Sequence, residues 1–154
     1  MAERATVARI TRVRFSPSAL QRGKMKILFI CKYNRFRSQI AENYFRKINK
    51  NKKIKSYSAG VIAGLPIIPV VRKTAKELGF TIKGKPKAIQ ESLLERIDLL
   101  VIVANDVPES LFETRVKKIM KWNIPDTTPK DICGIETISK QIMKHVDELN
   151  EALK

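Results

Sequence analysis

From Met25 onward, the apolar positions of the chain follow two alternating patterns. Runs of consecutive apolar residues predict buried strands at residues 26–30 and 97–104. A short strand is predicted at residues 54–58, and a weaker one with basic neighbours at residues 116–120. Helices are predicted at residues 38–48, 67–78, 92–95 and from about Thr137 to the end, where apolar residues recur every three or four positions in the longer segments. Strands that alternate with helices in this way predict an α/β domain with a doubly wound parallel sheet.

The end of the first predicted strand indicates a particular chemistry. Cys31 ends this strand, a tight loop follows, and Ser38 begins the next helix. In parallel α/β sheets, ligands bind beyond the carboxyl ends of the strands. A loop at this place can wrap its backbone amides and the guanidinium of Arg37 around a tetrahedral oxyanion, with the sulfur beneath it. The spacing therefore predicts phosphate-ester chemistry through a phosphocysteine intermediate, and the alternative is a buried structural cysteine.

The same loop contains groups that favour a thiolate, the form in which cysteine is a nucleophile. The first helical turn directs its positive dipole end at the site, Arg37 adds a fixed charge, and the Ser38 hydroxyl can donate a hydrogen bond to the sulfur. The leaving group also needs a proton, and we expect Asp126, on the loop after the last strand, to supply it. The alternative for Asp126 is an ordinary turn aspartate. Asp106 and Asp131 are weaker candidates, since Asp131 is expected to precede or cap the last helix.

Composition narrows the classes of protein to which the chain can belong. A length of 154 residues suits one domain, and no apolar run approaches the roughly 18 residues that a membrane span needs. Cys31 and Cys133 do not make a disulfide framework, so a reduced, cytoplasmic setting is expected. His145 is the single histidine, which argues against a histidine-based metal site or a Cys–His pair. No metal or other cofactor is expected.

The net charge of +16 favours anionic partners such as phosphate esters, nucleic acid or an anionic lipid surface. The alternative is a solvated, lysine-rich surface without a dedicated partner. Because no aromatic-rich RNA-binding motif or basic recognition helix stands out, nucleic acid is not the expected partner. The partner that we expect is a phosphorylated protein or a small phosphomonoester, with no membrane involved.

The order of several motifs resembles that of the low-molecular-weight protein tyrosine phosphatases and the related thioredoxin-coupled arsenate reductases. The resemblance covers about residues 26–150, and its pieces are the runs 31–38 and 39–42, the turn 58–60, the strand 98–103 and the loop around Asp126. It implies a three-layer α/β/α fold with a four-stranded parallel sheet and a phosphate-binding loop after the first strand. It also implies a cysteine-dependent phosphomonoesterase, a protein tyrosine phosphatase in type.

The resemblance assigns a role to each of several residues. Cys31 matches the nucleophile, Arg37 the phosphate-binding arginine, and Ser38 the hydroxyl that stabilises the thiolate. Asn34 matches the asparagine that holds the loop in shape, and Asp126 the general acid that later acts as base. The residues expected to bind the substrate are Lys32, Tyr33, Asn34, Arg35, Phe36 and Ser38.

The chain departs from the pattern of the family at several positions. Tyr33 replaces the usual glycine, which would be costly if the backbone requires a positive φ. Phe36 replaces a frequent second cysteine, and Thr127 replaces the proline that usually follows the acid. Two alternative functions remain. One is an arsenate reductase-like enzyme, although the loop 104–109 has no cysteine for a thiol relay and Cys133 is interpreted as a core or helix-start residue. The other is a non-catalytic module that binds phosphate or nucleic acid.

Residues 1–24 differ from the rest of the chain. They are rich in arginine, have Glu3 as their only acidic residue and show no sustained period. Such a leader is typical of a transit peptide, and it lacks the apolar core of a secretory signal. The run 13–17, Val-Arg-Phe-Ser-Pro, instead resembles translation across the T-arm of a tRNA gene, which makes Met25 the natural start. We therefore expect a non-core basic extension over residues 1–24 and a phosphatase domain over residues 25–154.

Overall fold

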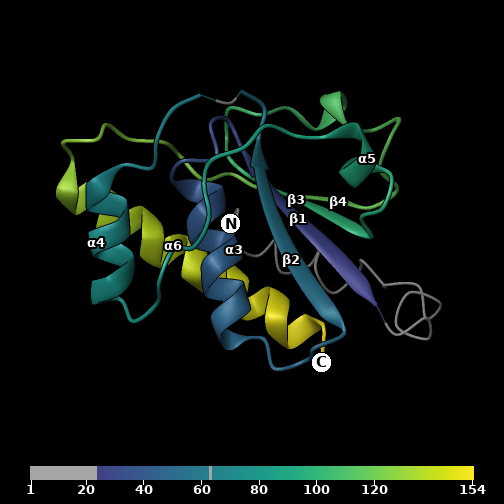
Figure 1. Ribbon diagram of the computed structural model, residues 1–154, viewed down its shortest axis with the longest axis horizontal. Helices are drawn as coiled ribbons and strands as arrows, with labels where there is room; N and C mark the ends of the chain where they lie inside the picture. Colours follow the sequence, from purple (N-terminus) through teal and green to yellow (C-terminus); the bar gives the residue numbers. More distant parts are fainter. Residues whose placement is uncertain (1–23, 63) are drawn as a thin grey trace.

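The computed structural model describes residues 24–62 and 64–154, so the expectations for residues 1–23 lie outside the described residues. The described chain forms a three-layer α/β/α fold around a four-stranded parallel sheet with the order β2-β1-β3-β4 (Figure 1). The strands are β1 (Met25–Cys31), β2 (Ile54–Gly60), β3 (Leu99–Val103) and β4 (Ile119–Trp122). Because β2 and β3 lie on opposite sides of β1, the strand order reverses at β1, and the predicted doubly wound sheet is confirmed.

The longer helices, α3 (Arg37–Ile48), α4 (Pro69–Glu77) and α6 (Ile132–Ala152), lie on one side of the sheet (Figure 1). The larger core fills the space between them and the sheet. Its aromatic centre is Phe29 of β1, whose ring centroid lies 5.9 Å from that of Phe45 and 6.1 Å from that of Trp122. This packing holds α3, and with it the loop before α3, against the sheet.

The other face of the sheet is covered by α5 (Glu91–Leu94), the 3₁₀ helix η1 (Glu109–Leu111) and their connecting segments. A smaller core lies here, in which Leu28 and Ile30 pack with Leu94 and Phe112. Side chains of β1 alternate between the two cores, since Phe29 belongs to the larger core and its neighbours to the smaller one. A strand that is buried on both faces needs apolar residues at consecutive positions, which explains the continuous apolar run that predicted it.

The predicted strands and helices are present in the predicted order, but some of their ends differ. The last helix begins at Ile132 instead of about Thr137, because the Asp131 carboxylate accepts a hydrogen bond from Gly134 N (2.9 Å) and caps the first turn. The last strand is Ile119–Trp122 instead of 116–120, because the N–H of residue 116 bonds to the carbonyl of residue 112 in the turn after η1. Cys133 lies at the start of α6, as predicted, but it is exposed and does not belong to a core.

None of the described helices is both long and apolar enough to span a bilayer.

Candidate active site

The loop between β1 and α3 surrounds the sulfur of Cys31. β1 ends at Cys31 and α3 begins at Arg37, one residue before the predicted helix start. Only 2% of the Cys31 surface is exposed. Its Sγ accepts a hydrogen bond from the backbone N–H of Asn34 (3.3 Å) and lies 3.0 Å from the Ser38 Oγ. The sulfur therefore has two hydrogen-bonding partners and lies next to the positive end of the α3 dipole.

The Asn34 side chain fixes the hydrogen bonds of this loop. Its Nδ2 donates to the Ser38 Oγ at 2.7 Å, so the Ser38 hydroxyl hydrogen is left to point at the sulfur. Its Oδ1 accepts from the Gln39 Nε2 (3.1 Å) and from the backbone N–H of Lys87 (3.0 Å). Asn34 is completely buried, and both of its side-chain polar atoms have partners. This arrangement supports the role in shaping the loop that the resemblance assigns to Asn34.

The backbone of the loop bends at Asn34 and not at Tyr33. Asn34 has a φ of 56°, and it is the only non-glycine residue with a positive φ in the described part of the chain. Asparagine tolerates this left-handed conformation better than tyrosine does. Tyr33 therefore avoids the strain that its substitution for glycine suggested. The glycine that the loop does require is Gly60, because a Cβ there would lie 2.7 Å from the backbone carbon of Tyr33.

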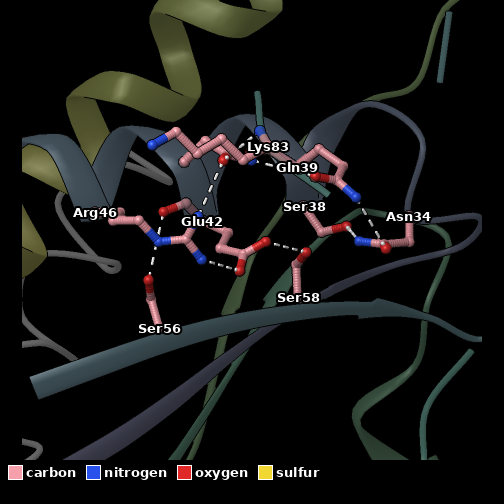
Figure 2. A network of polar contacts seen from close by, with 9 residues as sticks. Asn34, Ser38, Gln39, Glu42, Arg46, Ser56, Ser58 and Lys83 are labelled. Atoms are coloured by element: carbon pink, nitrogen blue, oxygen red, sulfur yellow. Dashed lines mark hydrogen bonds and ion pairs between the residues drawn. The ribbon is translucent and has the colours of Figure 1, made fainter. Parts of the chain in front are cut away.

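A buried polar network continues from the loop along α3 (Figure 2). Gln39 accepts from the Asn43 Nδ2 (3.2 Å), and the Asn43 Oδ1 accepts from the backbone N–H of Lys83 (2.9 Å). One turn away, the Glu42 carboxylate accepts from the Ser58 hydroxyl (2.6 Å) and pairs with Arg46 (2.7 Å). The network attaches both β2 and the segment 83–87 to α3. Sequence reasoning placed residues 39–42 in a helix and in the resemblance, but it gave the side chains of Gln39 and Glu42 no role.

The Arg37 guanidinium is buried and is held from one side. Only 1% of the Arg37 surface is exposed. Its Nη1 donates to the Asp106 Oδ1 and to the carbonyl of Ile124, both at 3.0 Å, and its Nη2 donates to the Asp106 Oδ2 at 3.3 Å. No described residue accepts a hydrogen bond from its Nε, so that edge is available to an oxyanion. Asp106, a weaker candidate for the acid, thus binds Arg37, a contact that sequence reasoning missed.

Asp126 also lies near this guanidinium. Its Oδ2 is 3.6 Å from the Arg37 Nη2, and 35% of its side chain is exposed. The backbone N–H of Thr127 donates to the Asp126 Oδ1 (2.9 Å), a bond that proline at this position would not make. The Thr127 hydroxyl donates to Asp131 (2.6 Å), and this bond, followed by that of the Gly134 amide, holds the pKa of Asp131 below its usual value. Asp131 therefore serves as a helix cap, as predicted.

The remaining loop residues differ in where their side chains lie. Lys32, Tyr33 and Arg35 are partly exposed beside Cys31. Phe36 is buried in the larger core, so it faces the loop with its backbone only. The described residues contain no group of three or more His, Cys, Asp or Glu side chains that could hold a metal ion. The structure thus brings the predicted nucleophile, arginine, hydroxyl and acid to one end of the sheet.

Replacing Gly60 with alanine tests the close approach of β2 to the loop. The added Cβ would meet the backbone of Tyr33 and Asn34 at 2.7 and 2.8 Å, so the loop must move. We expect Gly60→Ala to weaken binding of inorganic phosphate by about tenfold or more, a loss of roughly 1.4 kcal/mol, because the displaced loop amides no longer fit the phosphate oxygens. Gly84→Ala is the control, because a methyl group there meets nothing within 4 Å although its φ of 91° makes the change strained. Equal losses in both variants, measured by calorimetry, would contradict the expectation.

Known proteins with three different named activities are similar to this chain. A curated relative named arsenate reductase 1, from Staphylococcus haemolyticus, is 29% identical over 133 residues, which cover 84% of this chain and 98% of the relative. A low-molecular-weight protein tyrosine phosphatase from T. tengcongensis is 25% identical, with a TM-score of 0.72 over 83% of this chain and 99% of that one. The YwlE arginine phosphatase from Geobacillus stearothermophilus shares the fold, with 17% identity and a TM-score of 0.73 over 84% of this chain and 92% of that one.

The match to a protein family covers all of the described sheet except Met25, and all of the described helices. The family model described as low molecular weight phosphotyrosine protein phosphatase matches residues 26–154, which include Cys31 and Asp126. The chain therefore belongs to the low-molecular-weight phosphotyrosine protein phosphatase family.

Proposed function

We propose that this chain is a cysteine-dependent phosphomonoesterase that acts on phosphotyrosine in proteins through a phosphocysteine intermediate. The observation that carries the proposal is the environment of the Cys31 sulfur. It accepts the Asn34 amide hydrogen bond, lies 3.0 Å from the Ser38 hydroxyl oxygen and is next to the start of α3. These groups favour a thiolate, and Arg37 adds a planar fork that matches two oxygens of a phosphate.

In the first step, the phosphate of the substrate binds to the loop amides and to the Arg37 guanidinium. The Cys31 thiolate attacks phosphorus, the bond between phosphorus and the ester oxygen breaks, and Asp126 gives its proton to the departing oxygen. In the second step, Asp126 as carboxylate takes a proton from water, and the water oxygen attacks the phosphocysteine. The bond between sulfur and phosphorus breaks, which releases inorganic phosphate and restores the thiolate. Both steps need Asp126 near the phosphate, and its contact with Arg37 at 3.6 Å supports that position.

Two features support an aromatic phosphate ester as the substrate. Cys31 is 98% buried, so a phosphate group that reaches its sulfur must be attached to the end of a long side chain. The loop after β2 runs beside the Cys31 loop, since Val61 N bonds to the Cys31 carbonyl and Ile62 N bonds to the Lys32 carbonyl. The side chains of Val61, Ile62 and Leu65 in this loop are large, apolar and exposed. An aromatic ring bound against them would remove apolar surface from water.

Arsenate reduction is the second candidate, because the curated relative carries that name. An arsenate group on Cys31 would have to be resolved by another thiol. The second described cysteine, Cys133, is exposed at the start of α6 and is not on the loop after β3, where the relay cysteines were expected. We therefore propose that such a reaction would depend on an external thiol. A reactive cysteine that must stay reduced also favours the cytoplasm as the compartment, and we propose residues 25–154 as the domain that does the chemistry.

Substitution of the nucleophile tests the proposed activity. We expect the protein to hydrolyse p-nitrophenyl phosphate in the presence of a chelator and a reductant, and Cys31→Ser to abolish turnover while it still binds phosphate. Arg37→Lys should remove nearly all activity, because lysine keeps the charge and loses the two-pronged contact. Cys133→Ser is the matched control and should retain activity. Full activity in Cys31→Ser would overturn the mechanism, and arsenate reduction without ester hydrolysis would favour the second candidate.

Asp126→Asn tests the proposed acid. With a poor leaving group such as tyrosine, we expect the rate of the first step to fall by about 10²–10⁴-fold, because the leaving oxygen must then depart without a proton. With a nitrophenol, which leaves easily as an anion, the loss should be much smaller. Rapid-quench measurements on a phosphotyrosine peptide and on p-nitrophenyl phosphate give the two rates. An unchanged rate on the peptide, or equal losses on both substrates, would show that Asp126 is not the acid.

A further inference from the structure

Two basic side chains lie against one aromatic ring in the loop that contains Cys31. The Lys32 Nζ is 5.2 Å from the centroid of the Tyr33 ring, and the Arg35 guanidinium carbon is 5.5 Å from it. Attraction between a cation and the face of an aromatic ring favours these positions. The three side chains belong to the same loop as Cys31, and all are partly exposed. Tyr33 therefore gathers two positive charges on the loop that is proposed to bind the phosphate.

These charges have no carboxylate partner among the described residues. Neither Lys32 nor Arg35 takes part in an ion pair or a hydrogen bond to an acidic side chain within residues 24–62 and 64–154. The two carboxylates at the site, those of Asp106 and Asp126, both face Arg37 instead. The neighbouring loop after β2 presents the apolar side chains of Val61 and Ile62 on its exposed surface. The positive charge of Lys32 and Arg35 is thus available to a bound molecule.

The phosphate in the loop does not require these two residues. Its negative charge is met by the start of α3, by the loop amides and by Arg37, whose Nε has no protein acceptor in the described part of the chain. Lys32 and Arg35 add positive charge on the exposed rim, where the groups around the phosphate of a substrate would lie. Opposite charges placed across such an interface determine which partners are accepted.

We propose that Lys32 and Arg35 select phosphotyrosine in an acidic sequence, by contacting aspartate or glutamate side chains next to the phosphorylated residue. This inference rests on the proposed phosphatase function and adds a substrate class to it. The same charges disfavour basic sequences around the phosphotyrosine. They also disfavour phosphoarginine, because the guanidinium that carries the phosphate is itself cationic and would be repelled at the rim.

The experiment compares two phosphotyrosine peptides of equal length, one with glutamates beside the phosphotyrosine and one with glutamines. For the wild-type protein we expect kcat/KM to be about tenfold higher for the acidic peptide, the size that two exposed ion pairs would give together. The preference should decline as salt is raised from low to high ionic strength, because exposed charges are screened. In the variant Lys32→Gln/Arg35→Gln, which replaces both positive charges with neutral polar groups, the ratio of the two kcat/KM values should fall to about one.

The matched control is Lys52→Gln/Arg96→Gln. It removes the same net charge from residues that precede β2 and β3, at the amino-terminal end of the parallel strands, whereas Cys31 lies at their carboxyl end. The acidic preference should persist in this control. Loss of the preference in the control as well would show an effect of total charge and would overturn the proposal, as would a wild-type protein that hydrolyses both peptides equally well. A wild-type protein that hydrolyses neither peptide would overturn the proposed phosphotyrosine activity, and the inference with it.

Discussion

The candidate site depends on one buried side chain, that of Asn34, which holds a sharply bent loop in a single shape. Asn34 adopts a positive φ and completes its hydrogen bonds to Ser38, Gln39 and the backbone of Lys87. A buried polar group of Asn34 that lost its hydrogen-bond partner would destabilise the fold by about 1–3 kcal/mol, so the burial of this side chain depends on all three hydrogen bonds. Through them, the first turn of α3 and the segment 83–87 fix the loop. The donors around the Cys31 sulfur are consequently in place before any substrate binds, which is the arrangement that electrostatic catalysis requires.

The second constraint is the burial of a full positive charge. Arg37 has only 1% of its surface exposed, and such a charge is tolerated only where carboxylates and carbonyls compensate for the water it has lost. Asp106 accepts two hydrogen bonds from the guanidinium, and the Asp126 Oδ2 lies 3.6 Å from the Arg37 Nη2. The compensation explains why two acidic loops, one after β3 and one after β4, converge on the Cys31 loop. The residue proposed to bind phosphate and the residue proposed to move the proton are thus positioned by the same electrostatic need.

Much of this arrangement could be predicted from the sequence, and the failures have physical reasons. β1, the loop after it and Arg37 follow from local patterns, because a strand buried on both faces is continuously apolar and the loop residues are contiguous. The pairing of Arg37 with Asp106 joins residues 69 positions apart, which no local period reports. The one sequence signal for this pairing is that Asp106 follows the end of β3, and parallel sheets bind ligands beyond the carboxyl ends of their strands. The sequence predicts too late a start for α6, because the Asp131 cap stabilises its first turn and no apolar stripe marks that turn.

The proposed mechanism requires a covalent bond between the Cys31 sulfur and phosphorus. Mass spectrometry of protein quenched in acid during turnover of an aryl phosphate tests this bond most directly, especially in Asp126→Ala, where the second step lacks its base. We expect a phosphate adduct that maps to the peptide containing Cys31, that appears within the first turnover and that is absent from Cys31→Ser. An active protein that accumulates no adduct under these conditions, or one whose adduct maps to another residue, would show that the reaction does not pass through a phosphocysteine at Cys31.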